Sequence, residues 1–297
     1  MKVERAIILA AGMSSRFAPL SYEKSKALIT VRGEILIERQ IRQLQAAGIS
    51  SIYVVTGYKA EQFAYLQERF GVRLRYNPAY RSRNNHASIH AVKDVLENAY
   101  ICSADQYFVQ NPFQKMEEES FYAAVYAAGK TKEWCLQSDA DGFIRHVQIG
   151  GNDAWIMMGH AFWSASFAVR FRSILEDEYD RIETRGKLWE AIYMEHLDSL
   201  PMKIRKYPAS MIYEFDSLEE LRRFDVSYCA DTRSPILKRI AAALAVEEKD
   251  IHVLRAKKDR RGAVSGFLFR VPTGIYAYRY RSGQIRKAGK EDERETD

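Results

Sequence analysis

Apolar residues follow two alternating patterns over the first hundred positions. Residues 5–11 form a short, β-branched apolar run, which predicts a buried strand. Residues 35–48 repeat apolar positions at helical spacing and end at Gly48, which is typical of a helix C-terminus. The alternation continues with expected strands at 50–58, 72–78 and 99–108 and expected helices at 59–71 and 84–98. Strand–helix repeats of about 25–30 residues predict βαβ units and a mostly parallel sheet.

Beyond residue 120 the pattern loosens, and around residues 226–236 the composition changes. Between these points we expect strands at 121–128, 134–139, 143–150, 155–164, 202–208 and 211–217, and helices at 164–181, 186–200 and 218–225. A helix at 236–245 and a hairpin at 266–281 follow. We therefore predict a Rossmann-like α/β domain with a mixed, mostly parallel sheet over residues 1–228, and a small α+β appendage over residues 229–297.

Composition places the chain among soluble globular proteins. Its 297 residues are 47% hydrophobic and 28% charged, and no apolar run approaches the roughly 20 residues of a membrane span. The first apolar run is short and has no cleavage pattern, so we interpret it as a strand and not as a secretory signal. Cys102, Cys135 and Cys229 lie far apart without metal-ligand spacing, which favours reduced thiols and a cytoplasmic protein.

The net charge of +6 is confined to the C-terminal part of the chain. Residues 1–225 carry 29 basic and 29 acidic side chains, whereas residues 226–297 carry 16 and 10. The main body therefore has no charge excess that would favour a polyanion, and we expect no nucleic-acid partner.

A small-residue turn follows the first predicted strand, and two cations follow the turn. Ligands of open α/β sheets bind beyond the carboxyl ends of the strands, so this turn is the default site. Residues with almost no side chain, such as those at positions 10–12, let backbone N–H groups approach phosphate oxygens. Arg16 and Lys26 add further donors to phosphate. A plain βα turn with solvated cations is the structural alternative. The dinucleotide and Walker fingerprints are absent. The small residues of the turn are Ala10, Ala11 and Gly12.

Two predicted strand ends carry carboxylates. Asp105 ends the predicted strand 99–108, and Glu214 and Asp216 end a later one, where alternation places them on one face. Each has a structural interpretation, since a strand-end aspartate often forms a turn, and Asp216 with Ser217 could cap the following helix.

The motif L-A-A-G-x-x-[ST]-R, followed by P-L and K-[AP]-L, resembles the signature of the nucleotidyltransferases that make sugar nucleotides and related activated head groups. The resemblance implies that Leu9, Ala10, Ala11 and Gly12 hold an NTP. It also implies that Arg16 contacts the β- and γ-phosphates and that Lys26 faces the incoming phosphate. It further implies Mg²⁺ bound by Asp105 and Asp216, and two carboxylates suit this ion. The chain departs from the family at Ser103, where relatives often have a second aspartate, and at Ser14, where many have glycine. If that position needs a positive φ, serine is strained there.

A more specific resemblance extends over roughly residues 3–225. It is to the bacterial CTP:phosphocholine cytidylyltransferases, and its segments are 57–80, 133–139, 159–164 and 213–221. It implies transfer of CMP from CTP to phosphocholine, giving CDP-choline and pyrophosphate. Asn85 and Ser88 are predicted to contact the base or the ribose.

A trimethylammonium group is held best by aromatic faces, through cation–π attraction. All four tryptophans lie in the second half of the predicted main domain. By family position we predict a cage of Trp134, Trp189 and Tyr193, with Glu190 offsetting the positive charge. Tryptophans at this spacing are equally typical of a core.

Two other classes of function stay open. One is the same chemistry on phosphoethanolamine, 2-aminoethylphosphonate or a sugar 1-phosphate, and the other is a non-catalytic nucleotide-binding protein. The oligomeric state, including a homo-oligomer, is also open. The appendage faintly resembles the start of a choline-kinase-like N-lobe, but the sequence ends before a kinase catalytic loop. We therefore expect residues 229–297 to be catalytically incomplete and to form an accessory hairpin.

Overall fold

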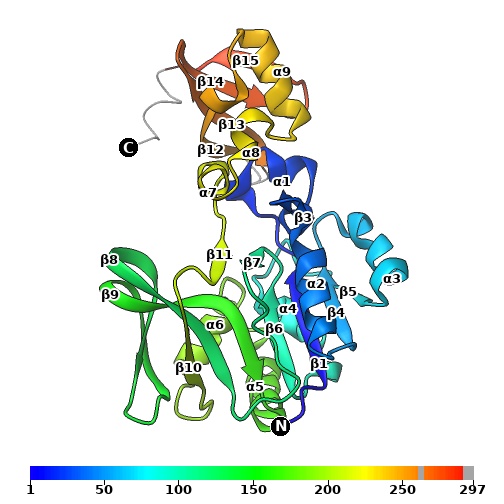
Figure 1. The fold of residues 1–297 in the computed structure, drawn as a ribbon, viewed down its shortest axis with the longest axis vertical. Helices are drawn as coiled ribbons and strands as arrows, with labels where there is room; N and C mark the ends of the chain where they lie inside the picture. The colour runs from blue at the N-terminus through cyan, green and yellow to red at the C-terminus, as the bar shows by residue number, and fades with distance from the viewer. Residues whose placement is uncertain (260–263, 290–297) are drawn as a thin grey trace. The chain divides into compact units, whose positions relative to one another are not determined.

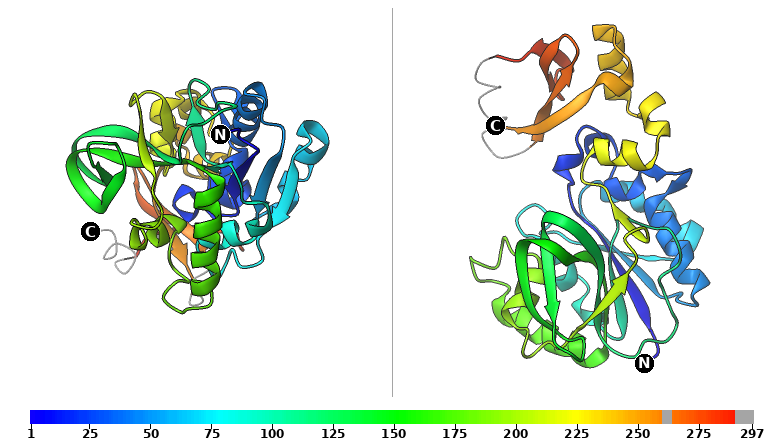
Figure 2. Two further views of the ribbon diagram at one scale, coloured as in Figure 1. Left: turned by 90° about the horizontal axis from the view of Figure 1, so that it is seen from below. Right: turned by 60° about the vertical axis from the view of Figure 1, so that its left-hand side comes forward.

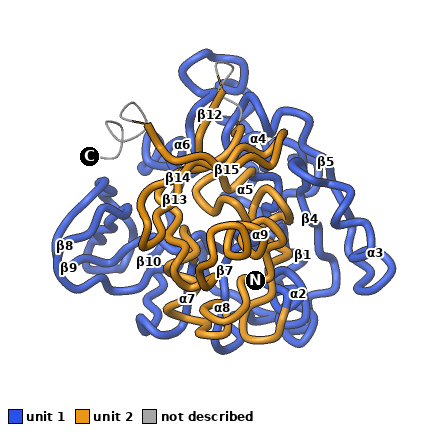
Figure 3. The backbone as a smooth tube through the Cα atoms, turned by 90° about the horizontal axis from the view of Figure 1, so that it is seen from above, with its two compact units in different colours: residues 1–12, 35–214 blue, residues 13–34, 215–297 orange. Residues whose placement is uncertain are grey.

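The structure is a computed structural model that describes residues 1–259 and 264–289. The chain divides into two compact units, coloured separately in Figure 3. The first contains Met1–Gly12 and Ile35–Glu214, and the second contains Met13–Glu34 and Phe215–Asp297. The predicted C-terminal appendage thus shares a unit with an N-terminal segment. Within the described ranges, no helix is long and apolar enough to cross a membrane.

The first unit is built on a seven-stranded sheet with the order β10-β8-β9-β6-β1-β4-β5. Strands β1 (Arg5–Ala10), β4 (Ile52–Thr56), β5 (Arg73–Tyr76) and β6 (Ala99–Ser103) are parallel to one another. All five residues of β4 are buried, which explains its continuous apolar run. The predicted mixed, mostly parallel α/β sheet is confirmed.

The other end of this sheet is a long, curled ribbon. Strand β8 (Phe121–Ser138) pairs antiparallel with β9 (Ile144–Trp163), and β10 (Lys203–Tyr207) pairs parallel with β8. Cys135 and Leu136 each pair with two separate segments of β9, so the ribbon folds back on itself (Figures 1 and 2). The four short strands expected here are therefore two long ones, interrupted by shifts of register.

Helices α4 (His86–His90), α5 (Ala165–Glu178) and α6 (Trp189–Glu195) enclose the core with one face of the sheet. Their buried side chains join Ile7 and Trp163 in one cluster. The predicted helix 84–98 is shorter than expected and is followed by a 3-10 turn. The remaining elements of this unit are α2 (Leu36–Ala46), η3 (Ala60–Phe63), α3 (Tyr65–Phe70), η4 (Lys93–Val95), β7 (Gln106–Phe108) and β11 (Ile212–Glu214).

The second unit contains a four-stranded antiparallel sheet with the order β12-β13-β14-β15. Phe267, Phe269 and Tyr278 from its strands are buried, as are Leu237 and Ile240 of α9. The α+β character predicted for the appendage is confirmed. Its elements are α7 (Leu218–Phe224), α8 (Ser227–Ala230), α9 (Pro235–Leu244), η5 (Glu248–Asp250), β12 (His252–Lys258), β13 (Val264–Val271), β14 (Gly274–Arg279) and β15 (Gln284–Lys287).

The N-terminal segment of this unit contains η1 (Ser15–Phe17), α1 (Leu20–Glu23), η2 (Lys26–Leu28) and β2 (Thr30–Val31), and β3 (Glu34–Ile35) follows. Contacts with the tail hold the segment in place. The Tyr22 and Tyr280 rings stack with their centroids 3.6 Å apart. A Glu23 carboxylate oxygen accepts the first free N–H of α9, and the Tyr228 hydroxyl donates to the Thr30 carbonyl at 2.7 Å.

Candidate active site

The small-residue turn begins where β1 ends, between the ends of two neighbouring strands. The Tyr58 N–H donates to the Ala11 carbonyl at 3.1 Å, and the Ala104 N–H donates to the Leu9 carbonyl at 3.2 Å. Ala10 and Ala11 are buried, whereas Gly12 is exposed, and a Cβ added at Gly12 would meet no atom within 4 Å. Packing within the protein therefore does not require the glycine at position 12.

Ser14 has the left-handed backbone conformation, with φ of 47° and ψ of 47°. The position therefore does have a positive φ, and serine occupies it at a cost of about 1–2 kcal/mol relative to a relaxed conformation. Such strain is often retained where a loop must keep a particular shape.

Three charged residues of the predicted site meet within the second unit. The Arg16 Nη1 atom lies 2.7 Å from one Asp216 carboxylate oxygen, and the Lys26 Nζ atom lies 3.8 Å from the other. Their exposure differs greatly, since the Arg16 side chain is 77% exposed and the Lys26 side chain 5%. The Lys26 ammonium also lies 5.8 Å from the centre of the Phe17 ring. The buried cation is thus held in place, whereas the exposed one can exchange partners cheaply, because exposed ion pairs contribute only about 0–1 kcal/mol.

The Asp216 carboxylate does not cap the following helix. Ser217 is the N-cap of α7, and its Oγ accepts the Glu220 N–H at 3.2 Å. The Glu220 side chain reaches back to accept the Asp216 N–H at 2.7 Å. This reciprocal capping fixes the backbone at Asp216 and leaves its side chain to the two cations.

Asp105 lies in the turn between β6 and β7, where it is half-buried. The next residue, Gln106, pairs with Glu214 where β7 and β11 run antiparallel. Asp216 follows Glu214 by two residues in the chain. Asp105 belongs to the first unit and Asp216 to the second.

Asn85 and Glu190, two of the predicted ligand contacts, hold each other at the start of α6. The Asn85 Oδ1 accepts the Trp189 N–H at 2.7 Å, and its Nδ2 donates to Glu190 at 3.1 Å. The Tyr122 hydroxyl donates to the other Glu190 oxygen at 3.0 Å. Burial raises the pKa of Glu190, and these hydrogen bonds oppose the rise. Ser88 is buried and accepts a hydrogen bond from Asn77 at 3.1 Å.

The predicted aromatic cage lies largely inside the core. Trp189 is 2% exposed, and its ring contacts Tyr122 and Trp163 at centroid distances of 5.5 and 5.0 Å. Tyr193 is fully buried, and among the described residues its hydroxyl has no hydrogen-bond partner. Trp134 is half-exposed and packs against the same core. The burial of Trp189 is typical of a core tryptophan, so its contact with a substrate stays a prediction.

Tyr122 and Asn77 are polar partners that sequence reasoning missed. Tyr122 lies in an apolar strand, and its pattern indicated only burial. Asn77 precedes Pro78 and looks like a turn former, and its side chain does accept the Ala79 N–H in addition to bonding Ser88. Neither hydrogen bond could be predicted from nearby residues, because Glu190 and Ser88, the partners of Tyr122 and Asn77, lie on other elements.

The chain is similar to known proteins in both sequence and fold. The sequence pattern of the MobA-like NTP transferase domain matches residues 6–159, which is more than half of the chain. The chain belongs to this family. The NTP transferase fold is shared with a solved structure of CTP:phosphocholine cytidylyltransferase from Streptococcus pneumoniae, with a TM-score of 0.72 and 34% identity, covering 75% of this chain and 97% of that one. The predicted resemblance to the nucleotidyltransferases is confirmed.

Two relatives that are similar to this NTP transferase over nearly their whole length are cytidylyltransferases. The choline-phosphate cytidylyltransferase of Streptococcus pneumoniae is 34% identical over 74% of this chain and 96% of its own length. The 2-aminoethylphosphonate cytidylyltransferase of Lancefieldella rimae is 37% identical over 77% of this chain and 95% of its own length. Nearly all of each relative is matched, while about a quarter of this chain lies outside the matched part. That surplus has about the length of the appendage.

Proposed function

We propose that this NTP transferase moves CMP from CTP to phosphocholine, with release of pyrophosphate. The observation that carries the proposal is the meeting of Arg16, Lys26 and Asp216, the charged residues on which a polyphosphate reaction would depend. The choline-phosphate cytidylyltransferase of Streptococcus pneumoniae, similar over nearly its whole length, supports the choice of substrates. We place the reaction in the cytoplasm, in keeping with three free cysteines.

The proposed reaction is an in-line displacement. A phosphate oxygen of the acceptor forms a bond to the α-phosphorus of CTP, and the bond from that phosphorus to the β-phosphate oxygen breaks. The attacking oxygen is already anionic, so no general base is needed. The contribution of the protein is to position the reactants and to neutralise charge.

Each residue of the signature has a role that suits its surroundings. Gly12 lets the triphosphate approach the turn after β1, which agrees with the open space at its missing Cβ. Lys26, buried and fixed, draws the two anions together. Arg16, exposed and held only by a surface ion pair, transfers from Asp216 to the leaving pyrophosphate. Breaking this exposed pair costs little, so the exchange does not weaken CTP binding greatly.

Mg²⁺ fits the donor set that we assign to it. Asp216 offers a half-exposed carboxylate already surrounded by cations, and Asp105 offers a half-buried one at a strand end. Carboxylate oxygens are the protein ligands that Mg²⁺ takes, and when bound the ion would neutralise phosphate charge.

The second candidate acceptor is 2-aminoethylphosphonate, favoured by the similarity to the enzyme of Lancefieldella rimae. A primary amine prefers carboxylates to an aromatic cage, and the carboxylate of Glu190 is engaged by Asn85 and Tyr122. We keep phosphocholine as the first choice, because the Streptococcus pneumoniae enzyme and its solved structure, both named for this substrate, are similar to the chain over most of its length.

A pyrophosphate-release screen tests the proposal. Four NTPs are paired with phosphocholine, phosphoethanolamine, 2-aminoethylphosphonate and glucose 1-phosphate, each with and without Mg²⁺. We expect the highest kcat/KM with CTP and phosphocholine. A higher value with another acceptor would assign the protein to that substrate, and no release with any pair would leave a nucleotide-binding protein without catalysis.

A further inference from the structure

A cavity of about 420 Å³ lies beside the Arg16–Asp216 ion pair, within the second unit. One wall comes from Ser15 and Arg16 of the signature segment, and another from the Asp216–Glu219 stretch. The third wall is strand β12 of the appendage, which lines the cavity with residues 253–256 and Lys258. The appendage thus borders the same charged residues that we assign to the triphosphate.

Strand β12 lies at the edge of the four-stranded sheet and is irregular. A shift of register between Val253 and Arg255 leaves Leu254 unpaired, and a second shift lies between Lys257 and Lys258. Bulges of this kind bend a strand and redirect side chains, often next to binding sites. They explain how four consecutive residues of one strand can line a single cavity.

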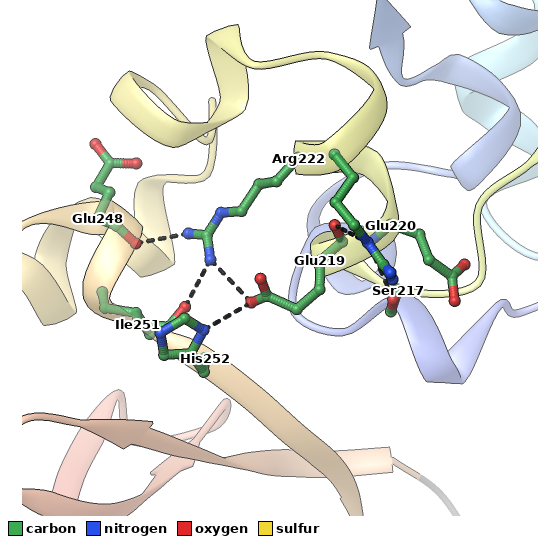
Figure 4. Close-up of polar contacts among 8 residues, drawn as sticks. Ser217, Glu219, Glu220, Arg222, Glu248, Ile251 and His252 are labelled. Atoms are coloured by element: carbon green, nitrogen blue, oxygen red, sulfur yellow. Dashed lines mark hydrogen bonds and ion pairs between the residues drawn. The ribbon is translucent and has the colours of Figure 1, made fainter.

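A buried arginine fixes the start of β12 to the helix that follows Asp216. Arg222 of α7 is 5% exposed, and its guanidinium donates to the carbonyl of Ile251 at 2.9 Å and to that of Glu248 at 2.6 Å. It also contacts the Glu219 carboxylate at 3.0 Å, which in turn lies 3.2 Å from the His252 ring (Figure 4). The wall formed by β12 is therefore attached to the capped helix that sets the backbone of Asp216.

The charge of the cavity favours a phosphate chain. Its lining includes three cations, Arg16, Arg255 and Lys258, and two carboxylates, Asp216 and Glu219. One of these carboxylates is assigned above to a divalent ion, and the other is held by Arg222. Arg16, Arg255 and Lys258 are the kinds of donor that phosphate oxygens require.

We infer that Arg255 and Lys258 of the appendage contact the β- and γ-phosphates of the bound nucleotide and the pyrophosphate that it releases. The inference rests on the proposed function, because it takes Arg16 to be the pyrophosphate contact. It gives the basic C-terminal region a direct part in binding the nucleotide. The shorter relatives match about three quarters of this chain, so the inference also predicts a difference between this protein and them.

Direct binding of pyrophosphate tests the inference independently of turnover. Isothermal titration calorimetry of the full chain with pyrophosphate, with and without Mg²⁺, is compared between wild type and the double variant Arg255→Met with Lys258→Met. We expect the double variant to bind about a hundredfold more weakly, because it loses two charge-assisted contacts that are each worth about a factor of ten or more. Lys257→Met is the matched control, since Lys257 is on the same strand but does not line the cavity. The single variant Lys258→Met changes only an exposed side chain. Its pyrophosphate affinity therefore tests the inference even if the double variant folds poorly.

The outcomes separate the inference from the proposed function. Weaker binding in the double variant with an unchanged Lys257→Met supports the inference, even if no acceptor yields turnover. Equal affinity in the wild type and both cavity variants overturns it, even if CTP and phosphocholine react. An equal loss in Lys257→Met also overturns it, because the effect would then come from the general basic charge. The inference is also overturned if the wild-type protein binds no pyrophosphate.

Discussion

Replacement of Lys26 by methionine is the sharpest test of the proposed chemistry. The Lys26 ammonium lies 3.8 Å from the Asp216 carboxylate, and its side chain is 5% exposed. A phosphate charge at the same distance would gain about 4 kcal/mol at an effective dielectric constant of about 20. If roughly three quarters of that gain arises only in the transition state, kcat falls by about 10²-fold, since each ~1.4 kcal/mol is a factor of ten.

The assay is steady-state pyrophosphate release with CTP varied at saturating phosphocholine. We expect the KM for CTP to change by less than about fivefold, because an interaction made mainly in the transition state lowers kcat more than it weakens substrate binding. Lys24→Met is the matched control, since Lys24 is exposed and two residues away. Thermal unfolding of both variants monitors the fold. A wild-type kcat in the Lys26→Met variant would refute the proposal that Lys26 stabilises the transition state. A change in the KM for CTP alone would show that Lys26 contributes only to substrate binding.

Three further expectations concern the metal, one buried carboxyl and the Arg222 contacts. Asp105→Asn and Asp216→Asn should each raise the Mg²⁺ concentration for half-maximal activity about tenfold or more, and an unchanged Mg²⁺ titration in either would remove that residue from the site. Burial raises the pKa of Glu190 above its ordinary 4.5, so folding takes up a proton and the free energy of unfolding falls as pH rises above that value. Glu190→Gln should flatten this fall in urea unfolding from about pH 5 to 8, and parallel curves would contradict it. Arg222→Met should lower the free energy of unfolding by about 2–3 kcal/mol in the same assay, through the lost hydrogen bonds to two carbonyls, and a loss below about 0.5 kcal/mol would show that these contacts are not structural.

The parallel part of the fold could be predicted because most of its strands are buried on both faces. A strand such as β4 carries a continuous apolar run that few other structures produce. Strand β12 could not be predicted in this way. It lies at the edge of a sheet, where charged residues are common, and its bulges break the alternation that would reveal it. The curl of β8 and β9 was missed for a similar reason, since register shifts divide each strand into shorter patterns.

The chemistry of the site was easier to predict than its geometry. Arg16 and Lys26 belong to one local motif, so the sequence alone indicates a phosphate site. Their meeting with Asp216 joins positions nearly two hundred residues apart, and no local pattern encodes it. The reciprocal capping by Ser217 and Glu220 shows that the Asp216 carboxylate does not cap α7, a point that the sequence left open. Burial of Trp189 is likewise a property of the packed core and not of its neighbours in sequence.

The attachment of the N-terminal segment to the tail has a consequence for protein engineering. Tyr22, Glu23 and Thr30 each contact a residue beyond position 227. A chimaera that fuses this tail to one of the shorter cytidylyltransferases would therefore need residues 13–34 transplanted with it. Without them, the grafted sheet would lose its stacking partner and α9 would lose the carboxylate at its first turn.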